Sequence, residues 1–293
     1  MKSSELILNA DGTVYHLALG MGDVAPQIIT VGDPERLDMF VPYLDEVLLR
    51  RQKREFHTLT GTYRGMPLSI MSTGIGTDNI DIVLTELDAL FNIDLATRRN
   101  RDTFTSLKLL RLGTSGAIKN FIPLDSYVFS RYAIGADGLM EYYAHQPSYR
   151  IQDALTHFQE QHAPLPSGLY VTESATTALP HLPEGTLQGI TYTAKGFYGP
   201  QGRYIGRAAL QFPDLVDKMG AFKIGLHETT NMEMETAGIL GMAEALGHEA
   251  GSLSVILANR QLGTFSENPK VAVERLVKDG LEMMYKWGRD SQN

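Results

Sequence analysis

The chain has 293 residues, of which 26 are Lys or Arg and 34 are Asp or Glu, so its formal net charge is −8, and it contains no cysteine. Without thiols it has no disulfide, no cysteine-ligated metal centre and no cysteine nucleophile. The acidic balance argues against a general nucleic-acid binder, because nonspecific binding to phosphate backbones draws on a surplus of Lys and Arg.

Short apolar runs predict strands, and longer stretches with apolar residues at helical spacing predict helices. Helices that separate near-continuous apolar strands are typical of an α/β protein whose sheet is covered on both faces. In chain order, we expect strands at Gln27–Val31 and Pro67–Thr73, a helix at Asn79–Phe91, strands at Leu107–Leu112 and Gly168–Thr172, a helix at Thr229–Leu246, a strand at Ser252–Asn259 and a helix at Pro269–Trp287.

No repeat or linker divides the sequence, so we expect residues 1–293 to form one domain. Residues 92–106 are polar and carry several arginines, which predicts a solvated connector, and residues 135–167 suggest no chemistry. No apolar run approaches the roughly 20 residues that cross a bilayer, and the first residues lack the apolar core of a signal peptide. We therefore expect a cytoplasmic protein that does not associate with membranes.

The first predicted strand ends in a sequence that suits an anion. It runs into Gly32, after which Asp33 is a candidate N-cap and Pro34 a candidate first helical residue. A helix that starts at a strand end offers free N–H groups to an anion, and Arg36 adds a charge within the first turn. Alone, the segment fits a capped turn with a surface arginine at least as well.

Two more predicted strand ends have similar chemistry. Arg111 interrupts an apolar strand, and a buried arginine persists only with an anionic partner. Gly113 and Gly116 allow the backbone to approach a ligand closely, and Thr114 adds a hydroxyl. Residues 72–79 also end a strand with small residues that open a helix. Each glycine cluster is weaker than the established phosphate-binding fingerprints, but three together predict a phosphate site.

These segments resemble the nucleoside phosphorylase family of the uridine phosphorylase type. The resemblance implies a single-domain fold with a central mixed β-sheet flanked by helices. It also implies a pentosyltransferase of pyrimidine salvage, in which inorganic phosphate attacks uridine to give uracil and ribose 1-phosphate, with no other cofactor required. The matching blocks, in the family's order, are VGDPERL (31–37), REFHTLTGTY (54–63), STGIGTDN (72–79), RLGTSGAI (111–118), FYGPQGRY (197–204), NMEMETAG (231–238) and ANR (258–260).

The resemblance also implies site residues. Phosphate would be bound by Gly32, Arg36, Arg111 and Thr114, and by Arg54 of a neighbouring subunit. Ribose would be bound by Thr114, Met234 and Glu235, and by His16 of the neighbouring subunit. The base would be bound by Phe197, Gln201, Arg203 and Arg260. The residues closest to the chemistry would be Arg111, Gln201, Arg203 and Glu235.

The residue types suit such a reaction. Arginine forks match phosphate oxygens, and an anion below an oxocarbenium-like sugar stabilises its positive charge. Gln201 can both donate and accept, as the O2/N3 edge of uracil requires, whereas Arg203 can only donate. Each residue also has an ordinary interpretation: Glu233 and Glu235 could begin an amphipathic helix, and His16 alone would be an unremarked surface histidine.

Two departures from the family pattern concern assembly. The connector at 92–106 is longer than in compact bacterial members and is similar to that of eukaryotic ones, so the hexamer of the compact forms stays open. A dimer is the minimum, because the resemblance implies that Arg54 and His16 act across subunits. Glu55 matches a carboxylate that helps bind a monovalent cation between subunits. Asn79 stands where a small hydroxyl residue would help it, so potassium also stays open.

Other functions would require different site residues. A purine nucleoside phosphorylase would place an acidic residue in a Ser-Asp pair after the last core strand, where this chain has Ala258, Asn259 and Arg260. A nucleosidase that uses water would have no need of three arginines around an anion. A non-catalytic nucleoside-binding protein is the third class, and the sequence does not exclude it.

Overall fold

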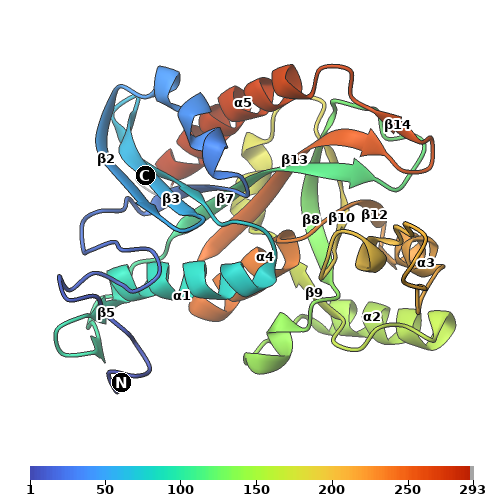
Figure 1. The fold of residues 1–293 in the computed structure, drawn as a ribbon, viewed down its shortest axis with the longest axis horizontal. Helices are drawn as coiled ribbons and strands as arrows, with labels where there is room; N and C mark the ends of the chain where they lie inside the picture. Colours follow the sequence, from blue (N-terminus) through green and yellow to red (C-terminus); the bar gives the residue numbers. More distant parts are fainter. Residues whose placement is uncertain (291–293) are drawn as a thin grey trace.

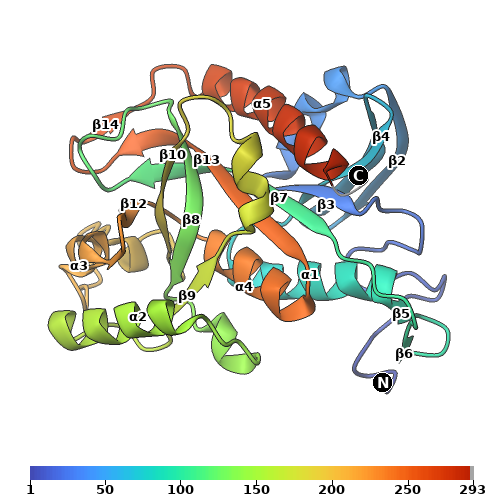
Figure 2. The same ribbon diagram turned by 180° about the vertical axis from the view of Figure 1, so that it is seen from behind.

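The computed structural model describes residues 1–290 and contains a mixed 12-stranded sheet with helices on both faces (Figures 1 and 2). The strands are β1 Gln27–Val31, β2 Glu46–Lys53, β3 Phe56–Tyr63, β4 Met66–Ser72, β7 Lys108–Ala117, β8 Tyr127–Gly135, β9 Tyr170–Glu173, β10 Leu187–Thr193, β11 Lys223–Ile224, β12 His227–Glu233, β13 Glu249–Asn259 and β14 Thr264–Phe265. The helices are α1 Thr77–Asn92, α2 Tyr149–His162, α3 Leu215–Ala221, α4 Thr236–Leu246 and α5 Pro269–Arg289. A separate hairpin is formed by β5 Ile93–Asp94 and β6 Arg99–Asn100.

The strand order brings distant segments together. The main path is β11-β12-β10-β8-β13-β7-β1-β4-β3-β2, in which β4, β1, β7 and β13 run parallel. Their carboxyl ends therefore meet at one edge. In addition, β12 pairs antiparallel with β7, with Met232 opposite Gly116, which closes a ring of β7, β13, β8, β10 and β12. This pairing joins the end of β12 to the carboxyl end of β7, so that Glu233 and Glu235, which follow Met232 in the chain, reach Arg111.

The two faces of the sheet are covered by different helices. On β1 and β7, Ile29 and Leu110 pack in the cluster that contains residues of α5, whereas Ile28 and Leu109 pack in the cluster of α1 and α4. Neighbouring residues point to opposite faces, as the two-residue period of a strand requires. Figures 1 and 2 show α5 on one side of the sheet and α1 and α4 on the other.

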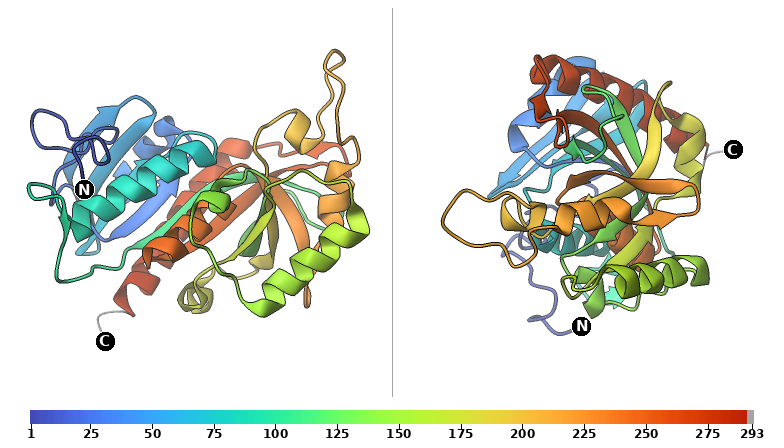
Figure 3. Two further views of the ribbon diagram at one scale, coloured as in Figure 1. Left: turned by 90° about the horizontal axis from the view of Figure 1, so that it is seen from below. Right: turned by 90° about the vertical axis from the view of Figure 1, so that its right-hand side faces the viewer.

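The peripheral segments differ from the core. Figure 3 shows a loop that extends from the body after the 3₁₀ turn Gly199–Gln201, and residues 204–209 within it are exposed.

Within residues 1–290 no helix combines the length and the apolar character needed to cross a membrane.

Most sequence predictions hold in this fold. The mixed α/β sheet is confirmed, and β1 has the predicted bounds. The other predicted strands and two of the helices match observed elements, and their ends differ by at most five residues, the largest difference being the end of β7. The predicted helix Thr229–Leu246 is wrong in its first part, because residues 229–233 belong to β12 and α4 begins at Thr236. The polar side chains of β12 are buried between β10 and β7, and this pairing depends on residues far away in the sequence.

Candidate functional site

A cavity of about 390 Å³ lies at the sheet edge where β1, β7 and β12 end. Segments 32–36, 111–116, 197–203 and 232–235 all contribute to its wall. The residues implied by the resemblance that line it are Gly32, Arg36, Arg111, Thr114, Phe197, Gln201, Arg203, Met234 and Glu235. Further lining residues include Asp33, Ile75, Ser115, Glu233, Leu257, Ala258 and Phe265.

Arg36 enters the cavity from a capped turn, as the sequence predicts. The Asp33 side chain accepts a hydrogen bond from the backbone N–H of Glu35 (2.9 Å), and Pro34 begins the 3₁₀ helix Pro34–Met39. Arg36 Nη1 donates to the carbonyl of Leu112 (3.2 Å). Burial, and then repulsion from Arg111, lowers the pKa of Arg36. No carboxylate within residues 1–290 forms an ion pair with it, so its charge is available to an anion.

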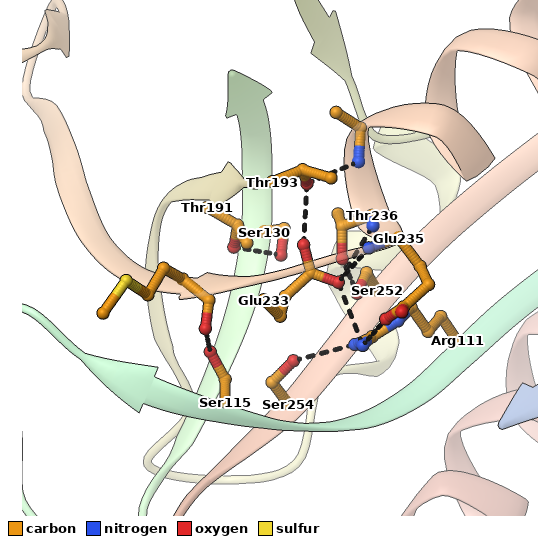
Figure 4. A network of polar contacts seen from close by, with 12 residues as sticks. Arg111, Ser115, Ser130, Thr191, Thr193, Glu233, Glu235, Thr236, Ser252 and Ser254 are labelled. Carbon is orange, nitrogen blue, oxygen red and sulfur yellow. Dashed lines mark hydrogen bonds and ion pairs between the residues drawn. The ribbon is translucent and has the colours of Figure 1, made fainter. Parts of the chain in front are cut away.

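Arg111 lies at the centre of the site, with its side chain 6% exposed (Figure 4). Its Nη2 contacts Oε2 of Glu235 (2.7 Å) and Oε2 of Glu233 (2.9 Å), and its Nη1 donates to Ser254 (3.3 Å). Burial alone would lower the pKa of Arg111, but the two carboxylates outweigh it and raise that pKa. The anionic partner required by a buried arginine is therefore present within the protein.

The guanidinium of Arg111 lies against Gly113, two residues along the same strand. A Cβ at Gly113 would lie 2.8 Å from Nη2 of Arg111 and closer still to Cζ and Nη1. Glycine is thus required here by a close approach of a side chain, rather than by an unusual backbone angle.

The two glutamates have different surroundings. Glu233 Oε2 accepts the backbone N–H groups of Glu235 and Thr236 (both 2.9 Å), and its Oε1 accepts the hydroxyl of Thr193 (2.7 Å), as Figure 4 shows. Among residues 1–290, Glu235 accepts only from the N–H of Gly76 (2.9 Å) and from Arg111. Burial raises the pKa of Glu235, an effect that Arg111 opposes and Glu233 reinforces.

The other end of the cavity is built from one turn. Gln201 is 3% exposed, and Arg203 Nη1 donates both to its Oε1 and to the carbonyl of Phe197 (2.6 Å). The guanidinium of Arg203 lies 3.9 Å from the centroid of the Phe197 ring, and Arg260 Nη1 donates to the carbonyl of Gln201 (3.3 Å). Burial, followed by repulsion from Arg260, lowers the pKa of Arg203. Hydrogen bonds therefore connect Phe197, Gln201, Arg203 and Arg260 into one group, although Arg260 does not line the cavity.

Within residues 1–290 no carboxylate other than Asp33, Glu233 and Glu235 lines the cavity, and these three interact with Arg36 or Arg111 rather than with Gln201 or Arg203. Asn259, at the position where a purine enzyme would have its acid, is 1% exposed and does not line the cavity. Its amide donates to the carbonyls of Lys119 (2.9 Å) and Ile122 (3.0 Å).

Besides Arg260, three implied residues do not line the cavity of their own chain. His16 pairs with Glu86 of α1, and Arg54 is exposed, with a φ of +54°. Glu55 lies beside Gly74, where an added Cβ would be 3.0 Å from Glu55 Cγ and 2.6 Å from Asn79 Nδ2. The structure thus brings Glu55 and Asn79 to the same glycine, and Asn79 donates to a backbone carbonyl (3.4 Å).

Sequence reasoning missed several lining residues. Glu233 was considered only as the start of a helix, although a carboxylate just before the helical run 236–246 is a signal for a cap. Phe265, which lines the cavity, and Ser254, which does not line it but accepts from Arg111, carried no signal. Ser254 lies on β13 opposite Gly113, and β14 brings Phe265 to the cavity by pairing with the end of β13. Only the sheet register places these side chains at the site.

Arginines, carboxylates and an amide around one cavity define a small-molecule binding site for an anion and a polar neighbour, on an α/β fold. The chain belongs to the phosphorylase superfamily, whose family model matches residues 26–280. The resemblance to nucleoside phosphorylases of the uridine phosphorylase type is confirmed by the comparisons that follow.

The relatives agree over most of the chain. A uridine phosphorylase of Thermococcus kodakarensis is 28% identical over 99% of this chain and 93% of its own length. A uridine phosphorylase of Escherichia coli is 28% identical over 84% of this chain and 86% of its own length. The solved structure of a Trypanosoma brucei nucleoside phosphorylase that shows uridine phosphorylase activity is 31% identical, covers 96% of this chain and 99% of that one, and superposes with a TM-score of 0.89.

Proposed function

We propose that this protein catalyses the reversible phosphorolysis of uridine to uracil and ribose 1-phosphate. The observation that supports this most directly is that a single cavity of about 390 Å³ is lined by Arg36 and Arg111, by Glu235, and by Gln201 with Arg203. These three groups suit phosphate, ribose and base in turn, the three parts of the reacting complex.

At the phosphate end, Arg36 and Arg111 bind the dianion together with Thr114 and the backbone at Gly32. Arg111 has five N–H donors, and its contacts within residues 1–290 use three of them, so Nε–H and one Nη1 hydrogen are left for phosphate. A phosphate oxygen forms the new bond to C1′ as the bond from C1′ to N1 breaks. The dianion below the sugar stabilises the oxocarbenium-like transition state.

At the ribose, Met234 packs against the ring and Glu235 accepts hydrogen bonds from its hydroxyls. Glu235 suits this role because, in the part of the chain that the structure describes, only Gly76 and Arg111 donate to its carboxylate, whereas Glu233 accepts from Thr193 and from the backbone at the start of α4.

At the base, the electron pair of the broken bond moves into the uracil ring, which then takes a proton from solvent. Gln201 both donates to and accepts from the O2/N3 edge, and Arg203 donates to the oxygen on which negative charge accumulates. Phe197 lines the pocket, and Arg260 holds the backbone of Gln201. The absence of an acid among the lining residues at this end favours uracil over a purine.

The same proposal covers the rest of the protein. Residues 1–293 act as one phosphorylase domain with an insertion at 92–106, in the cytoplasm, in pyrimidine salvage. The active form is at least a dimer, because His16 and Arg54 lie outside their own cavity and act on the neighbour's ribose and phosphate. Whether the assembly extends to a hexamer, and whether potassium binds near Glu55, are questions for measurement of mass and of activity against added potassium.

The test is an assay of uracil release from uridine by the full chain, with and without inorganic phosphate. We expect release to require phosphate and to yield one ribose 1-phosphate per uracil. Equal release without phosphate would establish a hydrolase instead, and binding of uridine without turnover would establish a non-catalytic binding protein. Faster turnover of inosine than of uridine would favour the purine enzyme.

A further inference from the structure

His16 lies against a buried carboxylate that belongs to none of the segments described above as the site. Glu86 is on α1 and is 7% exposed. Its Oε1 lies 2.6 Å from Nδ1 of His16, and its oxygens also accept the backbone N–H groups of His16 (3.0 Å) and Leu17 (2.9 Å). One carboxylate therefore fixes both the backbone and the ring of His16.

This contact determines which ring nitrogen of His16 is free. An ionised carboxylate only accepts hydrogen bonds, so the nitrogen that faces it carries a proton. Nδ1 is therefore the protonated nitrogen, and in the neutral ring Nε2 is an acceptor. A histidine without such a partner would divide its population between two tautomers and several rotamers.

Tyr15 and two cationic side chains also surround the ring of His16. The ring of Tyr15 stands edge-on to that of His16, with centroids 4.9 Å apart. Lys53 Nζ and Arg54 Cζ lie 5.4 Å and 5.9 Å from the centroid of the same tyrosine. His16 and Arg54 are therefore parts of one preassembled patch, and Glu86 anchors that patch to α1.

We propose that Glu86 is a positioning residue for the reaction. It holds His16 in the orientation and tautomer in which Nε2 accepts the ribose 5′-hydroxyl in the neighbouring subunit's cavity. This inference rests on the proposed function, in which His16 acts across the subunit interface. It predicts that Glu86 contributes to catalysis only through substrates that carry a 5′-hydroxyl.

The test compares uridine with 5′-deoxyuridine, which lacks that hydroxyl. Replacement Glu86→Gln keeps the size of the side chain but removes its charge and turns a donor toward three N–H groups. We expect kcat/KM for uridine to fall about 10- to 100-fold, the range for lost hydrogen bonds to charged groups, and that for 5′-deoxyuridine to fall no more than about twofold. His16→Ala should show the same pattern, and the double variant should lose no more than either single one.

A neighbour on the same helix provides the matched control. Asp88 also faces a histidine, His248 (Nε2 to Oδ1, 3.3 Å), and accepts from the amide of Asn92 (2.7 Å). Asp88→Asn should change kcat/KM for both substrates by the same factor. The ratio of the two values is independent of the amount of folded enzyme, so a loss of stability in Glu86→Gln does not obscure the result.

Equal losses with both substrates in Glu86→Gln would overturn the positioning role and leave Glu86 as a structural residue. So would a double variant that loses the product of the two single losses. Absence of phosphate-dependent uridine turnover in the unaltered protein would instead overturn the proposed function, and this inference with it.

Discussion

Gly113→Ala is the most direct test of the anion site, because it changes the position of Arg111 and leaves its chemistry intact. The backbone at Gly113 has an ordinary φ, so alanine is conformationally acceptable there. The new methyl group would lie 2.8 Å from Nη2 and closer to the rest of the guanidinium. Since van der Waals contact begins at about 3.5 Å, the guanidinium must retreat by roughly an ångström or more.

Such a movement breaks specific contacts. The bonds from Arg111 to Glu235 (2.7 Å) and Glu233 (2.9 Å) would lengthen past hydrogen-bond range, and the donors offered to phosphate would move equally far. Hydrogen bonds to charged groups contribute about 1.5–3 kcal/mol each, and a misplacement of about 1 Å near reacting groups costs about 100-fold. We therefore expect kcat/KM for phosphate to fall at least about 100-fold.

The assay is uracil release at saturating uridine with phosphate varied, and the control is Gly220→Ala on α3, a glycine that does not line the cavity. A Cβ at Gly220 meets only Cδ1 of Ile118, at 3.7 Å, so this variant should stay within about threefold of the unaltered protein. If Gly113→Ala showed unaltered phosphate kinetics, Arg111 would not bind the attacking anion and the assignment of the two ends of the cavity would be wrong.

Three further predictions test other parts of the structure. Gln201→Ala should lower kcat/KM for uridine about 100-fold or more, because a site built for hydrogen bonds penalises their loss; an unchanged rate would refute its role at the base. Asn259→Asp should lower the free energy of unfolding by about 1–3 kcal/mol in urea titrations without creating inosine turnover, since it turns a carboxylate toward the carbonyls that its amide now reaches. Burial raises the pKa of Asp137 above its ordinary value of 3.8, so the native state binds this proton more tightly and the free energy of unfolding falls as pH rises through the folded-state pKa. In the Asp137→Asn variant, the free energy of unfolding should fall less between pH 4 and pH 7 than in the unaltered protein. An equal fall in both proteins would contradict a raised pKa of Asp137.

The parts of the site that sequence could predict are local. The run into Gly32 with Asp33 and Pro34 encodes its own strand end and cap, and both appear as expected. Arg111 within an apolar strand implied a buried charge with an anionic partner, which is correct. In this structure that partner is a pair of glutamates, and their proximity is set by pairing between β7 and β12 rather than by anything near residue 111.

The parts that could not be predicted depend on that pairing. The run 229–233 is polar and was merged into the following helix, because burial of Thr, Asn and Glu side chains in a strand leaves no apolar period. Their polar groups are satisfied by neighbours on other strands, such as the bond from Asn231 to Ser115 (2.7 Å). Hydrogen bonds between distant strands stabilise β12, and a single sequence without its register does not show them.

The site also explains how an acidic protein can hold a dianion. Glu233 is fully engaged with Thr193 and the start of α4, so it is a permanent counterion that makes burial of Arg111 tolerable. Arg36, Arg203 and Arg260 have no carboxylate partner within residues 1–290, and the pKa of each is lowered by burial. Removing a charge from water weakens its screening, so these cations set the potential inside the cavity, whereas the net charge of −8 arises largely from exposed acids screened by solvent. The overall charge therefore argues against extended polyanions as ligands, whereas in the proposed function Arg36 and Arg111 bind one small anion locally.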